Sequence, residues 1–191
     1  MRFILVLAVS VLAVMSVAAQ NQSSKKKNTH VILETSKGII EIQMYNSDAP
    51  KTVANFVGLA KRGYFKGVLF HRVSKGFVIQ SGDPTGTGRG GKSIYGKEFE
   101  DELNPSTASY REGYTRGTVA MANRGPNTNT SQFFIMLADM PSMPKNYTIF
   151  WKVIKGMDVV DAIGSVEIIP QMGAMDGKPK VPIVIKKVTV Q

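Results

Sequence analysis

The sequence predicts a mainly β fold, a closed antiparallel β-barrel capped by two α-helices. Three observations support this fold class. Short apolar runs recur along the chain, loops rich in glycine and asparagine separate them, and only two segments have helical periodicity. Short antiparallel strands commonly close into barrels, because closure removes exposed sheet edges.

The first elements are a hairpin and a helix. Residues 30–45 hold two alternating apolar runs around a turn containing glycine, which predicts a β-hairpin. For the helix, Asp48 is expected to cap the first turn, Pro50 suits that turn and Gly63 can end it. Apolar residues at helical spacing fill the interval between them.

The later elements are mostly strands. A second short helix is predicted across Met157–Ile163, followed by Gly164 as a stop signal. Turn-rich segments separate the β-like runs and contain no internal repeat. The strands are expected at Val68–Arg72, Phe77–Gln80, Gly117–Ala122, Gln132–Leu137, Thr148–Ile154 and Val181–Val190.

The first 28 residues are expected to lie outside the folded domain. Residues 1–19 combine a positive start, an apolar run and small residues ending at Ala19, which is typical of a cleaved secretory signal peptide. An uncleaved membrane anchor is the alternative, but the apolar run is short for a span of ~20 residues. We expect residues 20–28 to form a flexible basic arm and residues 29–191 to form one domain. Because no KDEL-type tail ends the chain, we expect secretion rather than retention in the endoplasmic reticulum lumen.

Composition narrows the function classes. The chain has no cysteine, so its stability rests on hydrophobic burial without disulfides. The formal net charge of +10 favours acidic partners, but the basic residues are scattered and no nucleic-acid-binding motif is present. The two histidines have no ligand spacing around them, so we expect neither a metal nor a cofactor. N-glycosylation sequons begin at Asn21, Asn129 and Asn146.

One glycine-rich loop imitates a phosphate-binding motif. Residues Gly86 to Ser93 match G-x-x-x-x-G-K-[ST] letter for letter. That motif functions when a strand runs directly into the loop and a helix begins at its lysine. Here residues 81–85 intervene before the loop, and Gly96 and Pro105 interrupt the segment after it, so we predict a surface loop. The acidic run Glu98–Glu102 is likewise predicted to be a solvated turn, since it lacks calcium-loop spacing.

Three longer blocks carry a family resemblance. They are FHRVSKGFVIQSGDPTGTGRGGKSIYGKEFEDE, GTVAMANRGPNTNTSQFFI and YTIFWKVIKGMDVVDAI. From about Thr29 to Gln191 the chain resembles the cyclophilins, which are peptidyl-prolyl cis-trans isomerases. The resemblance implies an eight-stranded antiparallel barrel whose active site is a groove on its outer face. It also implies isomerisation of X-Pro bonds in proline-containing peptides and unfolded proteins. Nothing in the sequence suggests an obligate dimer, so we expect a monomer.

The resemblance also assigns roles to single residues. Arg72 would be catalytic, donating a hydrogen bond toward the prolyl nitrogen, a role that suits a permanently charged guanidinium. Without the motif, the same arginine would be interpreted as a surface charge and the apolar residues as core. The implied substrate-binding residues are His71, Phe77, Val78, Gln80, Ala122, Asn123, Gln132, Phe134, Met143 and Tyr147.

Val78, Met143 and Tyr147 differ mildly from the residues usual in the family, and four further departures have larger expected consequences. Ser142 stands at the position of a tryptophan that binds cyclosporin, so we expect weakened cyclosporin affinity. Trp151 replaces a usual glycine and is predicted to lie outside the pocket. Arg124 and Thr130 replace small groove residues. We expect Arg124 to favour acidic residues near the proline, and a glycan on Asn129 to be absent because it would obstruct the groove.

Two other function classes compete with the isomerase. A peptide-binding module with little turnover would also use a proline groove. A phosphate-binding enzyme would depend on the glycine loop alone.

Overall fold

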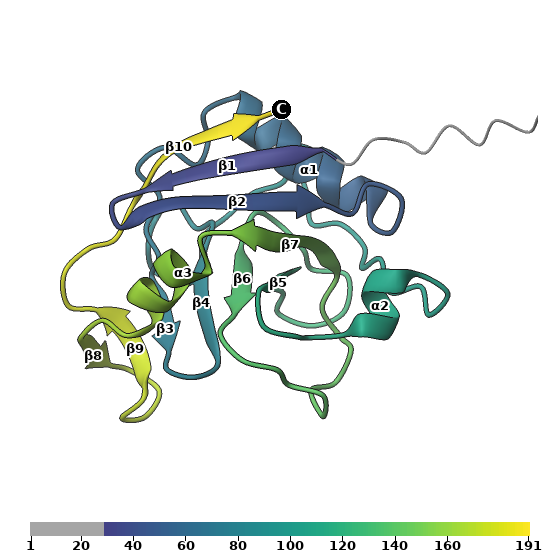
Figure 1. Ribbon diagram of the computed structural model, residues 1–191. Coiled ribbons are helices and arrows are strands. Elements are labelled where there is room, and N and C mark those ends of the chain that lie inside the picture. The colour runs from purple at the N-terminus through teal and green to yellow at the C-terminus, as the bar shows by residue number, and fades with distance from the viewer. Residues whose placement is uncertain (1–28) are drawn as a thin grey trace, which may run out of the picture.

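The computed structural model describes residues 29–191, so the predicted signal peptide and basic arm lie outside the described residues. Ten strands and three helices form the described part of the chain (Figure 1). In chain order they are β1 (His30–Thr35), β2 (Gly38–Met44), α1 (Pro50–Lys61), β3 (Arg72–Ser74), β4 (Val78–Ser81), α2 (Ala108–Glu112), β5 (Thr118–Met121), β6 (Phe133–Met136), β7 (Ile149–Lys155), α3 (Met157–Gly164), β8 (Ile168–Pro170), β9 (Asp176–Pro179) and β10 (Ile185–Val190).

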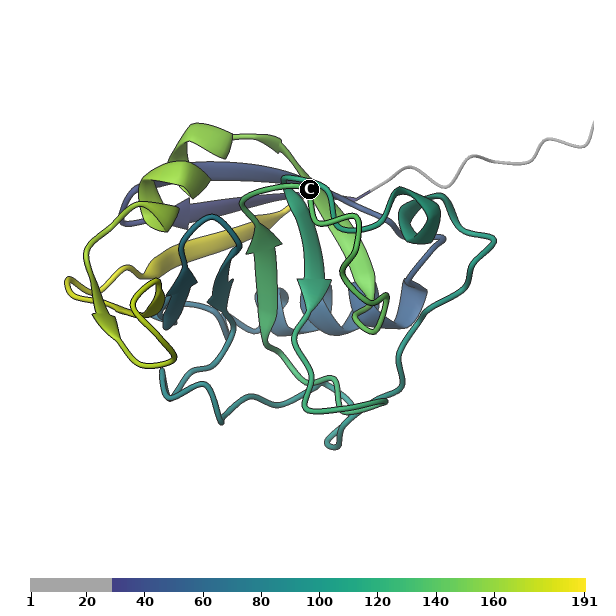
Figure 2. The same ribbon diagram turned by 90° about the horizontal axis from the view of Figure 1, so that it is seen from below.

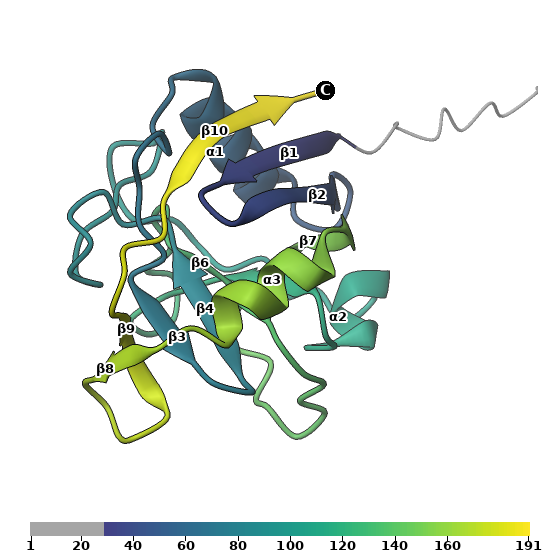
Figure 3. The same cartoon turned by 60° about the vertical axis from the view of Figure 1, so that its left-hand side comes forward.

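The strands form one curved antiparallel sheet in the order β10-β1-β2-β7-β5-β6-β4-β3-β9-β8. The prediction of a closed eight-stranded barrel is wrong in two respects. The sheet has ten strands, because a short hairpin, β8–β9, adds to β3 (Figure 3). It is also not closed, because only an isolated bridge between Leu69 and Val184 joins the segment before β3 to the segment before β10.

Three helices surround this sheet. Helix α1 packs against β10, α3 against β2, β3 and β4, and the short α2 against β7. Figure 2 shows α1 and α3 on opposite sides of the curved sheet. The two predicted helices are confirmed, whereas the five-residue α2 was not predicted. Within residues 29–191, no helix is both long enough and apolar enough to cross a membrane.

The C-terminal end of α1 agrees with the prediction, but its N-terminal start does not. Gly63 does follow the helix with a φ of 69°, and its N–H donates to Ala60 O while that of Tyr64 donates to Leu59 O, a Schellman motif. The predicted cap by Asp48 is wrong, because its carboxylate accepts a hydrogen bond from Ser109 N of α2.

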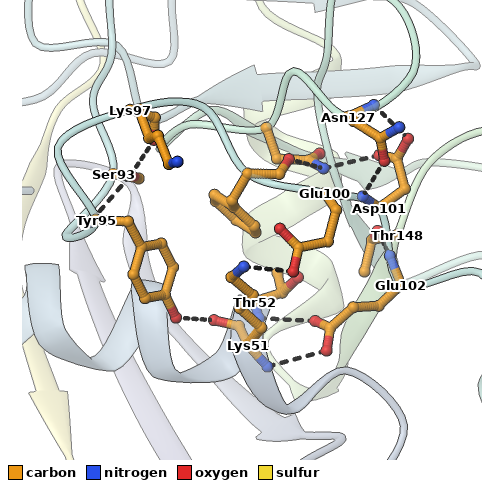
Figure 4. Close-up of polar contacts among 12 residues, drawn as sticks. Lys51, Thr52, Ser93, Tyr95, Lys97, Glu100, Asp101, Glu102, Asn127 and Thr148 are labelled. Atoms are coloured by element: carbon orange, nitrogen blue, oxygen red, sulfur yellow. Dashed lines mark hydrogen bonds and ion pairs between the residues drawn. The ribbon is translucent and has the colours of Figure 1, made fainter.

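Glu102 supplies the missing cap of α1 from the acidic run 98–102. Its carboxylate accepts hydrogen bonds from Lys51 N at 3.0 Å and Thr52 N at 2.8 Å, where the helix dipole favours negative charge (Figure 4). Glu100 pairs with the Lys51 side chain, and Asp101 accepts from Asn127 N. The prediction of a solvated turn holds only in part, since Glu98 and Glu100 are exposed whereas Asp101 and Glu102 are half-buried and bind other segments of the protein.

The sheet encloses an aromatic core. Trp151 of β7 is fully buried, with its ring centroid 4.4 Å from that of Phe56 in α1 and 5.1 Å from that of Phe133 in β6. This confirms the prediction that Trp151 lies outside the pocket expected from the family resemblance. A second apolar cluster, around Phe134 and Tyr114, lies on the outer face of the sheet. Neighbouring residues Phe133 and Phe134 join different clusters because successive strand residues point to opposite faces.

We expect Glu102→Ala to destabilise the protein. Two amides at the start of α1 would lose their acceptor, and loss of an N-terminal cap costs about 0.5–2 kcal/mol. Chemical denaturation followed by circular dichroism measures the change in the free energy of unfolding. Glu100→Ala is the matched control, because an exposed ion pair contributes about 0–1 kcal/mol. Equal destabilisation by both variants would contradict the capping role.

Candidate functional site

The candidate site is a row of side chains on the outer face of four neighbouring strands. Arg72 of β3 pairs in register with Gln80 of β4, Gln80 with Phe134 of β6, and Phe134 with Ala120 of β5. Since side chains alternate between faces along a strand, residues in register across the sheet share one face. The interior residues Val73 and Ile79 alternate with this row and are completely buried.

A pocket of about 180 Å³, lined by six apolar and three polar residues, lies along this row. Phe134 and Tyr147 meet there edge to face, with ring centroids 5.4 Å apart and planes at 87°. Tyr147 is held in place by Tyr114, whose hydroxyl accepts from Tyr147 N and donates to Tyr147 O. Every residue that lines the pocket was among those predicted: Arg72, Phe77, Val78, Gln80, Ala122, Asn123, Phe134, Met143 and Tyr147.

The Arg72 guanidinium is held on two sides. Its Nε donates to Asp176 Oδ1 at 2.9 Å, its Nη2 to Asp176 Oδ2 at 2.6 Å, and its Nη1 to Gln80 Oε1 at 3.2 Å. The hydrogen bond from Arg72 outweighs the effect of burial and lowers the pKa of Asp176, so the carboxylate is ionised and the pair is charge-assisted. A guanidinium has five N–H donors, of which these bonds engage three, and the remaining two have no hydrogen-bond partner among residues 29–191.

The network continues from Gln80 into the glycine loop. Gln80 Nε2 donates to Gln132 Oε1 at 2.9 Å, and Gln132 Nε2 donates to the carbonyls of Gly88 and Gly90. Gln132 is buried and lines the adjoining groove rather than the proline pocket. Both ends of its amide are engaged by protein groups, so Gln132 fixes the orientation of Gln80.

The glycine loop encloses a carboxylate of the protein itself. Asp83 is completely buried, and its oxygens accept hydrogen bonds from the backbone N–H groups of Thr85, Thr87, Gly88 and Gly90. Burial alone would raise the pKa of Asp83, but these bonds and the Thr85 hydroxyl lower it to about 2. The amides that would hold a phosphate are therefore occupied, and no helix begins at Lys92.

His71 lies outside the proline pocket, on the wall of a neighbouring cleft. It is 6% exposed, and burial lowers its pKa, so its imidazole is neutral at physiological pH. Neither ring nitrogen has a hydrogen-bond partner among residues 29–191. Within that part of the chain, nothing pairs His71 with a nucleophile.

The positions that depart from the family pattern have distinct environments. Arg124 forms an ion pair with Glu98, which reduces its availability to a ligand. Asn129 is completely buried, and its Nδ2 donates to Asp101 Oδ1 and Phe99 O, so the atom that would carry a glycan is inaccessible in the folded protein. Ser142 is exposed beside the pocket residue Met143.

Sequence reasoning missed Asp176 and Asp83. Asp176 is 104 positions from Arg72, on a strand that the pattern did not predict, so no local signal identified it. Asp83 did carry a signal. It stands three residues before Gly86, the first of four glycines in residues 86–91, and clustered backbone N–H groups of such loops commonly bind an anion.

Comparison with known proteins agrees with this geometry. Residues 30–190 match the family described as cyclophilin type peptidyl-prolyl cis-trans isomerase/CLD. Over 137 residues the chain is 52% identical to peptidyl-prolyl cis-trans isomerase CYP18-2 of Arabidopsis thaliana, covering 72% of this chain and 81% of that protein. Over 139 residues it is 53% identical to human peptidyl-prolyl cis-trans isomerase-like 1, with the same two coverages.

Solved structures include the same fold. A cyclophilin type isomerase of Cryptosporidium parvum, crystallised in the presence of the dipeptide Ala-Pro, superposes with a TM-score of 0.76 at 38% identity. The match covers 85% of this chain and 98% of that one. This chain therefore belongs to the cyclophilin-type peptidyl-prolyl cis-trans isomerase family.

Proposed function

We propose that this isomerase acts on proline-containing peptides and unfolded proteins in the secretory pathway, and that Arg72 is its catalytic residue. The single observation that supports the role of Arg72 is its position. A guanidinium with two donors that have no partner among residues 29–191 borders a pocket whose aromatic side chains suit a proline ring. The signal-like residues 1–19 support the cellular assignment.

The reaction needs no nucleophile and no proton transfer. Resonance in the peptide bond sets a barrier of about 18–20 kcal/mol, and uncatalysed X-Pro exchange takes tens to hundreds of seconds. Lowering the barrier by about 7 kcal/mol accelerates exchange about 10⁵-fold. The enzyme must therefore bind the twisted amide, in which conjugation is broken, more tightly than either planar isomer.

The residues at this pocket contribute to binding of the twisted amide in different ways. Phe77, Phe134 and Tyr147 hold the proline ring in the apolar pocket. Arg72 donates a hydrogen bond to the prolyl nitrogen, whose lone pair becomes available only in the twisted amide, so this contact favours the transition state. Asn123 borders the same pocket and is positioned to bind substrate backbone, although its Nδ2 donates to Asn146 O here. Weakened cyclosporin affinity is expected from the exposed serine at position 142 and remains part of the proposal.

Arg72→Ala should remove most of the catalysis. Loss of one preorganised donor to the transition state commonly lowers kcat about 10²–10³-fold. A protease-coupled proline-peptide assay measures the rate, and Lys37→Ala, in the β1–β2 turn, is the control for loss of one positive charge. If wild type and Arg72→Ala both match the uncatalysed rate, the chain is a peptide-binding module instead.

Asp176 is expected to act through Arg72 as a positioning residue. Asp176→Ala frees the guanidinium on one side, and because misplacement of a catalytic group by about 1 Å can cost 10²-fold, kcat should fall at least about tenfold. In an Arg72→Ala background the same change should have no further effect on kcat, since the group that Asp176 positions is absent. An equal loss in both backgrounds would show that Asp176 affects only the fold.

The secretory assignment has a direct test. Full-length protein expressed in a eukaryotic host should appear in the medium with Gln20 as its first residue, because the small residues before it suit signal peptidase. N-terminal sequencing and intact mass of the secreted protein measure this. Retention of residues 1–19 on membrane-bound protein would favour the alternative of an uncleaved anchor.

A further inference from the structure

A second hollow adjoins the proline pocket, and we call it the cationic cleft. It has a volume of about 730 Å³ and lies between the glycine loop and the β8–β9 hairpin, which projects beside β3 (Figure 3). It shares Arg72 and Gln80 with the proline pocket, so the two hollows lie side by side. Its lining is His71, Arg72, Gln80, Gly86, Thr87, Gly88, Arg89, Gln171, Met172 and Lys178.

The charge of the cleft is not compensated. Arg72 is neutralised by Asp176, but the side chains of Arg89 and Lys178 form no ion pair or hydrogen bond within residues 29–191. No carboxylate of this part of the chain lines the cleft, and the nearby Asp83 is buried and saturated by loop amides. The neutral His71 adds no charge.

The backbone on both sides of the cleft is fixed. On one side, the amides of the glycine loop hold Asp83, and a Cβ at position 90 would lie 2.3 Å from Asp83 Oδ1, so Gly90 allows this close approach. On the other, the hairpin turn is closed by Gln171 N and Met172 N, which both donate to Asp176 O. The two cations therefore extend from a preorganised backbone, which lowers the ordering cost of binding a ligand.

We propose that the cationic cleft binds the acidic side chain of an aspartate or glutamate near the substrate proline, with Arg89 and Lys178 as its partners. A chain seated in the proline pocket advances about 3.3 Å per residue, so a residue one to three positions from the proline reaches the cleft. The carboxylate then meets two cations that have no other partner among the described residues. This specificity rests on the proposed function of the proline pocket.

Matched peptides test the proposal. Glutamate is compared with glutamine at each of three positions on either side of the proline, in the protease-free, NMR-detected isomerisation assay at low salt. Contacts between exposed charges are individually weak, so we expect kcat/KM to rise about threefold to tenfold for glutamate on one side of the proline only. The preference should shrink at 0.5 M salt, because the Debye length falls well below about 10 Å.

Three variants make the test specific. Arg89→Gln/Lys178→Gln should abolish the preference for glutamate while leaving activity on the glutamine peptides unchanged. Lys37→Gln/Lys61→Gln removes two charges elsewhere and should keep the preference, which controls for the net charge of +10. Lys178→Gln alone should reduce the preference for glutamate. Arg89 also lines the groove over Asn123, so a response to Arg89 alone would place the carboxylate there and overturn the assignment.

Two further outcomes separate failure of this inference from failure of the proposed function. Equal kcat/KM for glutamate and glutamine at every position, with normal activity on both, would refute the cleft and leave the isomerase intact. If the wild-type protein isomerised none of the peptides, the result would instead contradict the proposed function of the proline pocket.

Discussion

The buried carboxylate of Asp83 is the interaction on which the geometry of the site depends. An isolated buried charge is costly, and here four backbone N–H groups offset that cost while drawing the glycine loop around the carboxylate. The loop carbonyls of Gly88 and Gly90 are then placed to accept from Gln132. Gln132 orients Gln80, and Gln80 binds Arg72, so one connected network joins the buried anion to the Arg72 guanidinium.

The same hydrogen bonds explain why we expect no phosphate at this loop, although its sequence matches a phosphate-binding motif. Both uses depend on one physical property, the concentration of backbone N–H groups that glycines permit. In a nucleotide-binding protein the anion comes from the ligand, whereas here Asp83 supplies it from within the chain. The motif therefore correctly indicates an anion-binding loop, but it does not distinguish a ligand anion from a carboxylate of the chain itself.

The proline pocket could be predicted from the sequence because it is built on strand alternation and register. Once residues 70–83 are aligned with a known motif, Arg72 and Gln80 fall on one face. The features that escaped prediction depend on contact between segments remote along the chain. Closure of the barrel requires such pairing, and the cap of α1 comes from Glu102, about fifty positions away. Local capping rules favour the adjacent Asp48, but a folded chain satisfies helix amides with whichever carboxylate packing brings close.

The ion pair between Arg72 and Asp176 is another contact between segments remote along the chain, and it bears directly on function. Isomerisation requires a donor that is fixed before the amide twists, because energy spent on ordering the donor would be lost from the transition state. The β8–β9 hairpin, absent from the expected barrel, carries the carboxylate that provides this rigidity. The Asp176 carboxylate also offsets the positive charge of the guanidinium. Arg72 is therefore held in position, but it attracts anions less strongly. In the adjoining cleft, by contrast, the side chains of Arg89 and Lys178 have no ion-pair partner among the described residues.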